Sequence, residues 1–107
     1  MRLRWTLRAR QQLADIGRFI ARDKPGAARR WVETLRRRAA GAAERPLAGR
    51  AVPELDREDI REVIVRGYRI VYRVSEGLVE VLAVFESHRL LRAALGGSGV
   101  PSEDPEA

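Results

Sequence analysis

The stretch IREVIVRGYRIVYRVSEGLVEVLAVF, residues 60–85, decides the fold, because apolar residues recur at every second position along much of its length. A period of two is typical of strands that bury one face. Gly67 and the pair Glu76-Gly77 interrupt the alternation where tight turns would fit. We therefore predict a meander of three antiparallel strands over residues 60–65, 68–74 and 78–85.

The turn at Glu76-Gly77 also predicts the pairing within the last hairpin. With Ser75 opposite Leu78, one face is almost wholly apolar: it pairs Val74 with Val79, Tyr72 with Val81, Ile70 with Ala83, and Tyr68 with Phe85. The other face pairs Arg73 with Glu80, Val71 with Leu82, and Arg69 with Val84. A slip by one residue would bury arginine, so this register is favoured. We expect helices to cover the apolar face, and the other face to display arginines on an apolar floor.

Two helices are predicted upstream of this meander. Residues 2–5 alternate as a short strand, and Thr6 then suits a helix N-cap. Apolar residues follow at helical spacing over residues 7–22 and again over residues 25–43. Pro25 fits the first turn of the second helix, and the short link predicts an antiparallel helical hairpin.

The remaining segments complete an α+β fold. Residues 46–55 contain two prolines and a glycine, which argues against a regular element there. A short C-terminal helix is expected from Ser87, as its cap, to Leu95. The predicted order is β-α-α-β-β-β, with the helical hairpin on one face of an antiparallel sheet. We expect a single domain over residues 1–95 and a flexible acidic tail over residues 96–107.

Composition restricts the possible functions. The 107 residues contain 21 basic and 15 acidic side chains, a formal net charge of +6, and three of the acids lie in the last five residues. Such a charge attracts polyanions or acidic proteins. One histidine and no cysteine argue against a zinc site, and no dinucleotide or phosphate-loop fingerprint is present, so we expect no metal and no cofactor. Without a signal sequence or an apolar span, we expect a cytoplasmic protein that does not insert into membranes.

Basic side chains are the candidate functional groups. They come from the strands, from the loop before them and from the residues after the last strand: Arg50, Arg61, Arg69, Arg73, His88 and Arg89. Two interpretations stay open. Arg61, Arg69 and Arg73 either contact a target, or pair with Glu62, Glu80 and Glu86 across the sheet face.

A family resemblance rests on three groups of residues. Trp5-Thr6 leads into a helix, and Pro46-Leu47, Gly49-Arg50 and Pro53-Glu54-Leu55 mark the central loop. The most specific piece is Tyr68-Arg69-Ile70-Val71-Tyr72, with His88-Arg89 after the last strand. On these residues the chain resembles the RelE/ParE toxin superfamily, and within it the ParE branch, over about residues 3–90.

The resemblance implies a toxin of a type II toxin–antitoxin system with one of two activities. ParE-like members inhibit DNA gyrase, whereas RelE-like members cut mRNA on the ribosome. The ribonuclease reading would use Arg61, Arg69, His88 and Glu44 for catalysis. The tyrosine that such enzymes often carry near the C-terminus is absent, which favours gyrase and a binding role for the basic residues. A third reading is a degenerate, non-toxic member that only binds its partner.

The resemblance also implies a cognate antitoxin that neutralises the chain. We expect its segment to fold along the helical hairpin or on the open sheet face. The residues predicted to bind it are apolar: Phe19, Val71, Leu82, Val84, Leu90 and Leu91.

Overall fold

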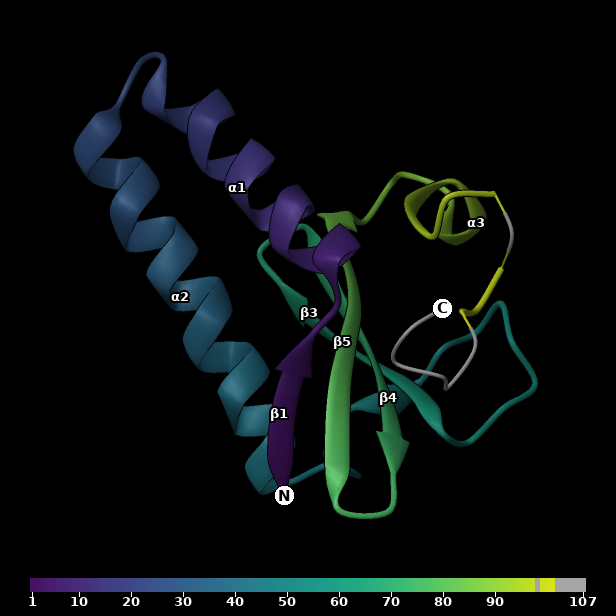
Figure 1. The fold of residues 1–107 in the computed structure, drawn as a ribbon. Coiled ribbons are helices and arrows are strands. Elements are labelled where there is room, and N and C mark those ends of the chain that lie inside the picture. The colour runs from purple at the N-terminus through teal and green to yellow at the C-terminus, as the bar shows by residue number, and fades with distance from the viewer. Residues whose placement is uncertain (98, 102–107) are drawn as a thin grey trace.

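A hairpin of two long helices lies on one face of a sheet in the computed structural model, which describes residues 1–97 and 99–101 (Figure 1). The elements are β1 (Arg2–Trp5), α1 (Leu7–Ala21), α2 (Pro25–Glu44), β2 (Arg50–Ala51), β3 (Ile60–Val65), β4 (Tyr68–Ser75), β5 (Leu78–Glu86) and α3 (Leu91–Ala94). This confirms the predicted α+β fold and its helical hairpin. Most of the predicted acidic tail, namely residues 98 and 102–107, lies outside the described residues.

The sheet has five strands in the order β1-β5-β4-β3-β2. β1 runs parallel to β5, and the other neighbours are antiparallel, so the sheet is mixed. β2 was not predicted: its residues Arg50 and Ala51 pair with Glu62 and Arg61 of β3. The turn-rich segment before β3 therefore contains a short edge strand, and the order of elements is β-α-α-β-β-β-β.

The start of each long helix follows from its sequence. The Thr6 hydroxyl accepts a hydrogen bond from the Ala9 amide at 3.1 Å, as expected of an N-cap. Pro25 occupies the first position of α2, where the absent N–H is not needed. Between the helices, a side chain at Gly17 would approach Val32 to 3.0 Å, so glycine permits close packing of the hairpin.

The helix-side core packs α1 and α2 against alternate residues of the sheet. Leu13 and Leu35 from the helices meet Ile70 and Val81 from the strands. Tyr68 stacks against Trp31 with 5.7 Å between ring centres. The buried Tyr72 donates a hydrogen bond from its hydroxyl to the Pro46 carbonyl at 2.8 Å. Both tyrosines thus lie on the helix-covered face, as the predicted alternation requires.

The predicted register holds for half of the last hairpin and fails for the other half. Ser75 lies opposite Leu78 and Tyr72 opposite Val81, as predicted, but a β-bulge follows between Val71 and Tyr72. Beyond it the pairs are Val71 with Ala83, Ile70 with Val84, Arg69 with Phe85, and Tyr68 with Glu86. The extra residue is on β5, so Val84 packs on the helix side, whereas Phe85 and Ala83 pack on the other face.

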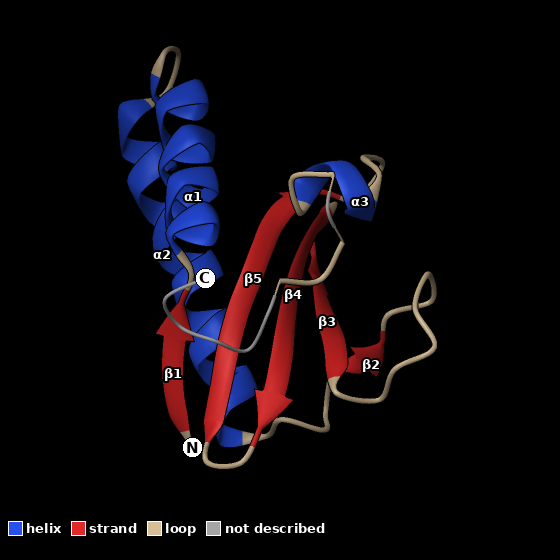
Figure 2. Cartoon of the chain, turned by 45° about the vertical axis from the view of Figure 1, so that its right-hand side comes forward, coloured by secondary structure: helices blue, strands red, loops and turns tan. Residues whose placement is uncertain are grey.

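The face opposite the hairpin is covered, which corrects the prediction of an open face. Figure 2 shows α3 and the chain before β3 on the side of the sheet away from α1 and α2. Val71, Leu82 and Phe85 form a buried cluster there, together with Val52, Ile60, Ala83, Leu91, Ala94 and Leu95. The sheet is therefore sandwiched between two apolar layers rather than half exposed.

The C-terminal helix is shorter than predicted. α3 begins at Leu91, after Leu90 at the N-cap position, so Ser87 is not its cap. Ser87 instead donates its backbone N–H to the Gly67 carbonyl at 2.7 Å. Leu91 and Leu95 point into the second core, while Leu90 remains 75% exposed.

Candidate functional site

Arg69 lies at the centre of an ion-pair network on the α3 side of the sheet. It projects from β4, and its Nε donates to Glu62 of β3 at 2.6 Å. Its Nη1 and Nη2 donate to the two oxygens of Glu54 at 2.7 and 2.8 Å. Arg50 of β2 donates from Nε to the second oxygen of Glu62 at 2.6 Å. Two carboxylates therefore hold two guanidinium groups across three strands.

A second network lies toward the other end of the same face. Arg73 donates to Glu80 at 2.7 Å, and Arg4 of β1 reaches the second oxygen of Glu80 at 2.6 Å. Arg73 also donates to the Pro101 carbonyl at 2.6 Å. The predicted pairing of Arg73 with Glu80 across the hairpin is confirmed.

The two arginines of the central strand are not displayed to solvent. Arg69 is only 6% exposed and Arg73 only 2%, because the second apolar layer closes over them. The prediction that this face presents them outward was wrong. Of the two interpretations left open by the sequence, pairing is found for Arg69 with Glu62 and for Arg73 with Glu80, whereas Arg61 donates to the Gly49 carbonyl.

Electrostatics fix the charges in the Arg69 network. The hydrogen bonds from Arg69 lower the pKa of the Glu54 carboxyl, with burial opposing the effect. The same pair raises the pKa of Arg69. Both groups therefore stay charged near neutral pH, and neither is poised to exchange a proton.

The other predicted basic residues are scattered around the sheet. The Arg50 side chain is 60% exposed despite its bond to Glu62. Arg61 lies on the opposite, helix-side face and donates to the Gly49 carbonyl at 2.8 Å. His88 is exposed and lies 3.4 Å from Glu86, and Arg89 is exposed beside it.

Glu44, the predicted acid of a ribonuclease site, is the last residue of α2. It is exposed and belongs to the helix layer, across the sheet from the Arg69 guanidinium. The carboxylate that meets Arg69 is instead Glu54, which the sequence presented only as part of the central loop. Its signal was weak, because nothing in a loop without periodicity indicates where a side chain points.

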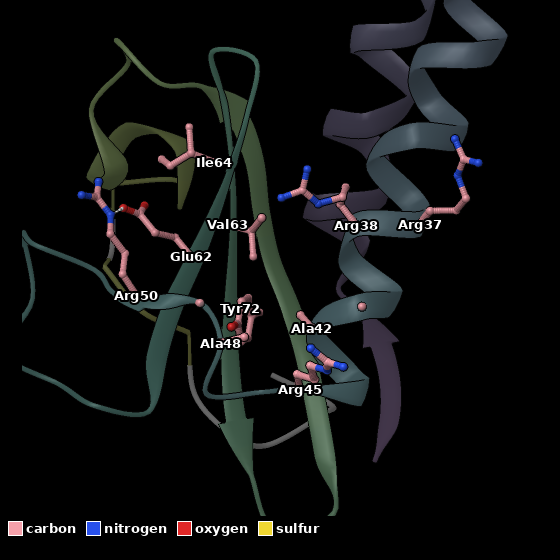
Figure 3. A pocket seen from close by; sticks show the side chains of 12 residues that line it. Arg37, Arg38, Ala42, Arg45, Ala48, Arg50, Glu62, Val63, Ile64 and Tyr72 are labelled. Atoms are coloured by element: carbon pink, nitrogen blue, oxygen red, sulfur yellow. Dashed lines mark hydrogen bonds and ion pairs between the residues drawn. The ribbon is translucent and has the colours of Figure 1, made fainter.

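A row of arginines runs along the exposed side of α2, with Arg37 pointing away from β3 (Figure 3). We define the α2 ridge as Arg30, Arg37 and Arg38, which fall within one half of the helix surface at 100° per residue, together with Arg45, the C-cap residue that follows them. Beside it lies a pocket of about 390 Å³ between α2 and the edge of β3. Figure 3 shows Arg38 directed from α2 toward β3, Arg45 below it, and Val63 and Tyr72 on the opposite wall. Gly41 and Ala42 complete the wall of the pocket on α2.

The outer side of the hairpin carries a second, more apolar groove of about 520 Å³. Its floor is formed by Gly17, Ala21, Ala28 and Val32, and its rim carries Arg18, Arg29 and Arg36 with one acid, Glu33. Phe19, near the end of α1, is 67% exposed and lines a separate hollow with Asp15 and Arg22.

The residues predicted to bind an antitoxin divide into two sets. Phe19 and Leu90 are exposed and accessible. Val71, Leu82, Val84 and Leu91 are buried within the chain itself, so the expected apolar floor is already occupied.

Two further features of the described part of the chain bear on the site. No helix in residues 1–97 is both long and apolar enough to span a bilayer. Within the same described residues, no cluster of three or more histidine, cysteine or carboxylate side chains forms that would hold a metal ion.

Comparison with known proteins agrees with this architecture. Residues 3–91 match the family model described as the ParE toxin of the type II toxin–antitoxin system parDE. Toxin Y4kP of Sinorhizobium fredii is 39% identical over 90 residues, which cover 82% of this chain and 90% of that protein. Toxin RelE2 of Caulobacter vibrioides is 36% identical over 86 residues, covering 80% and 94%.

A solved structure supports the same fold. The chromosomal ParDE toxin–antitoxin system from P. aeruginosa contains a chain that superposes with a TM-score of 0.69 at 18% identity. The superposition covers 80% of this chain and 95% of that one. Together, the family match across residues 3–91 and the two toxin relatives show that the chain belongs to the ParE toxin family of type II toxin–antitoxin systems.

Proposed function

We propose that this chain arrests growth by binding and inhibiting DNA gyrase, without doing chemistry itself, and that a cognate antitoxin neutralises it. The observation that carries the proposal is the engagement of Arg69 by Glu54 and Glu62 through three of its nitrogen atoms. Its charge is neutralised inside the fold, and the guanidinium is not presented to a scissile phosphate.

RNA cleavage would need a base for the 2′-hydroxyl, an acid for the leaving oxygen and cations for the phosphate. The lowered pKa of Glu54 makes that carboxylate a weak base. His88 pairs with Glu86 after β5, and Glu44 belongs to the helix layer. The candidate groups thus form no cluster around Arg69, which favours a binding toxin over an endoribonuclease.

The proposed target contacts are the accessible members of the predicted basic set. Arg50, His88 and Arg89 are exposed and suit charge-assisted contacts with gyrase. Arg69 and Arg73 support them from within, by tying strands β3, β4 and β5 together. Arg61 supports the loop before β2 in the same way, through Gly49.

The antitoxin is proposed to lie along the outer side of the helical hairpin. The sequence predicted two surfaces for the antitoxin, the helical hairpin and the open sheet face. Since the second sheet face is filled by the chain itself, the apolar groove between α1 and α2 is the one of these two that remains accessible. Its rim carries more arginines than acids, so it suits an amphipathic helix with acidic flanks. Phe19 is exposed on another side of α1 and is proposed as a separate apolar contact for the antitoxin.

The experiment is a gyrase cleavage assay with purified chain, supercoiled plasmid and ATP. Inhibition of the poisoning type would accumulate linear, protein-linked DNA, and the His88→Ala/Arg89→Ala variant should need a several-fold higher concentration for the same effect. Arg10→Ala removes the same single formal charge, histidine being counted as neutral, from an exposed position on α1 and serves as the matched control. Unchanged supercoiling and cleavage at high molar excess of the chain would refute the proposal.

The similarity to toxin RelE2 makes ribosome-dependent mRNA cleavage the second candidate. Pulse labelling after induction separates the two, because a gyrase inhibitor stops DNA synthesis first and a ribonuclease stops protein synthesis first. Cuts within translated messages would support the ribonuclease. Growth without any arrest, in cells lacking antitoxin, would instead support a degenerate member that only binds its partner.

A further inference from the structure

We propose that the α2 ridge is a docking surface for the phosphate backbone of duplex DNA. The choice of DNA rests on the proposed inhibition of gyrase, an enzyme that works on duplexes, whereas the surface itself follows from the placement of the arginines. It lies on a different layer of the molecule from the Arg69 network.

The ridge cations lack acidic partners. Within residues 1–97 and 99–101, no carboxylate pairs with Arg37, Arg38 or Arg45, whereas Arg50, Arg69 and Arg73 are all held by acids. Glu62 borders the pocket, but it is buried and already accepts from two arginines. Two exposed acids of α2, Glu33 and Glu44, lie at the margin of the ridge beside Arg37, and neither forms an ion pair with it.

The length of the ridge matches a stretch of duplex. From Arg30 to Arg45 the helix rises by about 22 Å at 1.5 Å per residue. One strand of a duplex places a phosphate every 3.4 Å or so along the axis, so the ridge spans roughly six phosphates of one strand. Guanidinium groups also match phosphate oxygens in geometry, because their planar donors bind two oxygens at once.

The make-up of the ridge favours DNA over an acidic protein. Protein interfaces are centred on large apolar or aromatic anchors, and charged residues are depleted at their core. Between its arginines the ridge presents Thr34 and Gly41, and no large apolar side chain of α2 is exposed. The apolar walls of the neighbouring pocket support the arginine stems and leave the charged ends at its mouth.

Gly41 offers a sharp test because it lies in the middle of the ridge. A side chain there meets no atom within 4 Å, and the residue is helical, so substitution does not disturb the packing. Gly41→Glu places a carboxylate among the arginines, while Gly41→Ala adds a methyl group and no charge. The pair separates electrostatics from backbone effects.

The experiment measures fluorescence anisotropy of a labelled duplex of roughly two helical turns, about 20 base pairs, titrated with purified chain at about 50 to 200 mM salt. Arg38→Ala/Arg45→Ala should weaken binding about tenfold or more at the lowest salt. It should also reduce the slope of log K against log salt by about 0.9 for each phosphate that the variant no longer neutralises. Gly41→Glu should weaken binding at least as much, and Gly41→Ala should bind as the parent does.

Arg10→Ala/Arg29→Ala is the matched control, since it removes the same charge outside the ridge: Arg10 is on α1, and Arg29 lines the outer groove of the hairpin. Equal losses in the ridge and control variants would overturn the inference, because net charge alone would then explain binding. Absence of duplex binding by the parent chain at the lowest salt would also overturn it and favour an acidic protein partner. Circular dichroism of each variant establishes that it is folded.

Failure of this inference is distinguishable from failure of the proposed function. Ridge variants that release duplex DNA yet still trap gyrase would place the ridge outside inhibition and leave the proposed function standing. A parent chain that binds duplex through the ridge but leaves gyrase unaffected would support the ridge and refute gyrase as the target.

Discussion

Two groups of arginines on this chain have the same side chain but differ in their burial and in their ion pairs. Arg69 and Arg73 are buried between the sheet and its second cover, each held by at least one carboxylate. The α2 ridge lies in solvent and no acid pairs with Arg37, Arg38 or Arg45 among the described residues. The buried group binds the fold together, and the exposed group is available to another molecule. Composition alone does not separate the two, because placement decides which role a guanidinium takes.

The largest expected effect comes from removing a buried acid. Glu62→Ala should lower the free energy of unfolding by about 3 kcal/mol, because it removes a buried carboxylate that accepts from two arginines, leaving Arg50 without its acid and Arg69 with Glu54 alone. Urea denaturation at neutral pH measures the change. Glu33→Ala, an exposed acid on α2, should stay within about 0.5 kcal/mol of the parent. A loss below about 1 kcal/mol for Glu62→Ala would mean that the network does little for the fold.

Two glycines sharpen the same contrast between a packed and an open position. A methyl group at Gly49 would lie 2.2 Å from the Tyr72 hydroxyl and 2.8 Å from the Glu62 carbonyl oxygen. Gly49→Ala should therefore destabilise by about 1–3 kcal/mol, whereas Gly41→Ala on the open ridge should stabilise α2 by about 0.5–1 kcal/mol. Thermal unfolding gives both signs. Adding Tyr72→Phe to Gly49→Ala should recover part of the loss, and no recovery would contradict the proposed clash.

Acid should weaken the buried network before it affects the ridge. The pKa of Glu54 lies below its usual value of 4.5 in the folded chain, first because of its bonds to Arg69. Its contribution to stability is therefore complete above that usual value and is lost as the pH falls through the lowered, folded-state pKa. Urea midpoints between about pH 5 and pH 2 should fall less steeply for Glu54→Gln than for the parent. Identical slopes would show that the Glu54–Arg69 pair does not contribute.

The smallest effect is expected from the ridge itself. Arg38→Ala/Arg45→Ala should change the free energy of unfolding by no more than about 0.5 kcal/mol, since these exposed side chains form no ion pair within the part of the chain that the structure describes. Chemical denaturation beside the Glu62→Ala variant makes the comparison direct. A loss above about 1 kcal/mol would assign the ridge a structural role and narrow the contrast with the buried group.

Periodicity predicted most of the fold correctly, for reasons that also explain its failures. Alternating strands and amphipathic helices each have one buried side, so residues 7–43 and 60–85 revealed their elements. The stretch Leu82-Ala83-Val84-Phe85 is apolar at every position, so any register places apolar residues of β5 on both faces. The sequence pattern therefore does not indicate the bulge. The pairing of β4 with β5 was predicted correctly only where Arg73 and Glu80 alternate with apolar residues.

The site was less predictable than the fold. Glu80 lies opposite Arg73 in the last hairpin, and this made their pairing foreseeable. Glu62 lies opposite Val71 of β4 and opposite Arg50 of β2, a strand that was not predicted. The role of Glu54 and the cover over Arg69 come from residues 52–59 and α3, which contact the sheet through a segment of turns without periodicity. Long-range contacts of that kind depend on tertiary packing, so local propensity did not indicate them.

The extra residue in β5 reverses the alternation of side chains between the two faces of the sheet. Before it, odd-numbered residues of β5 such as Val79 and Val81 pack on the helix side of the sheet. After it, the even-numbered Val84 packs on that side. One continuous strand thereby contributes hydrophobic side chains to both core layers. Phe85 lies against Arg69, with 5.2 Å between its ring centre and the guanidinium carbon. In a relative that lacks this extra residue, the alternation along the rest of the strand would be reversed. The residues suited to the helix side and those suited to the α3 side would then have to exchange positions.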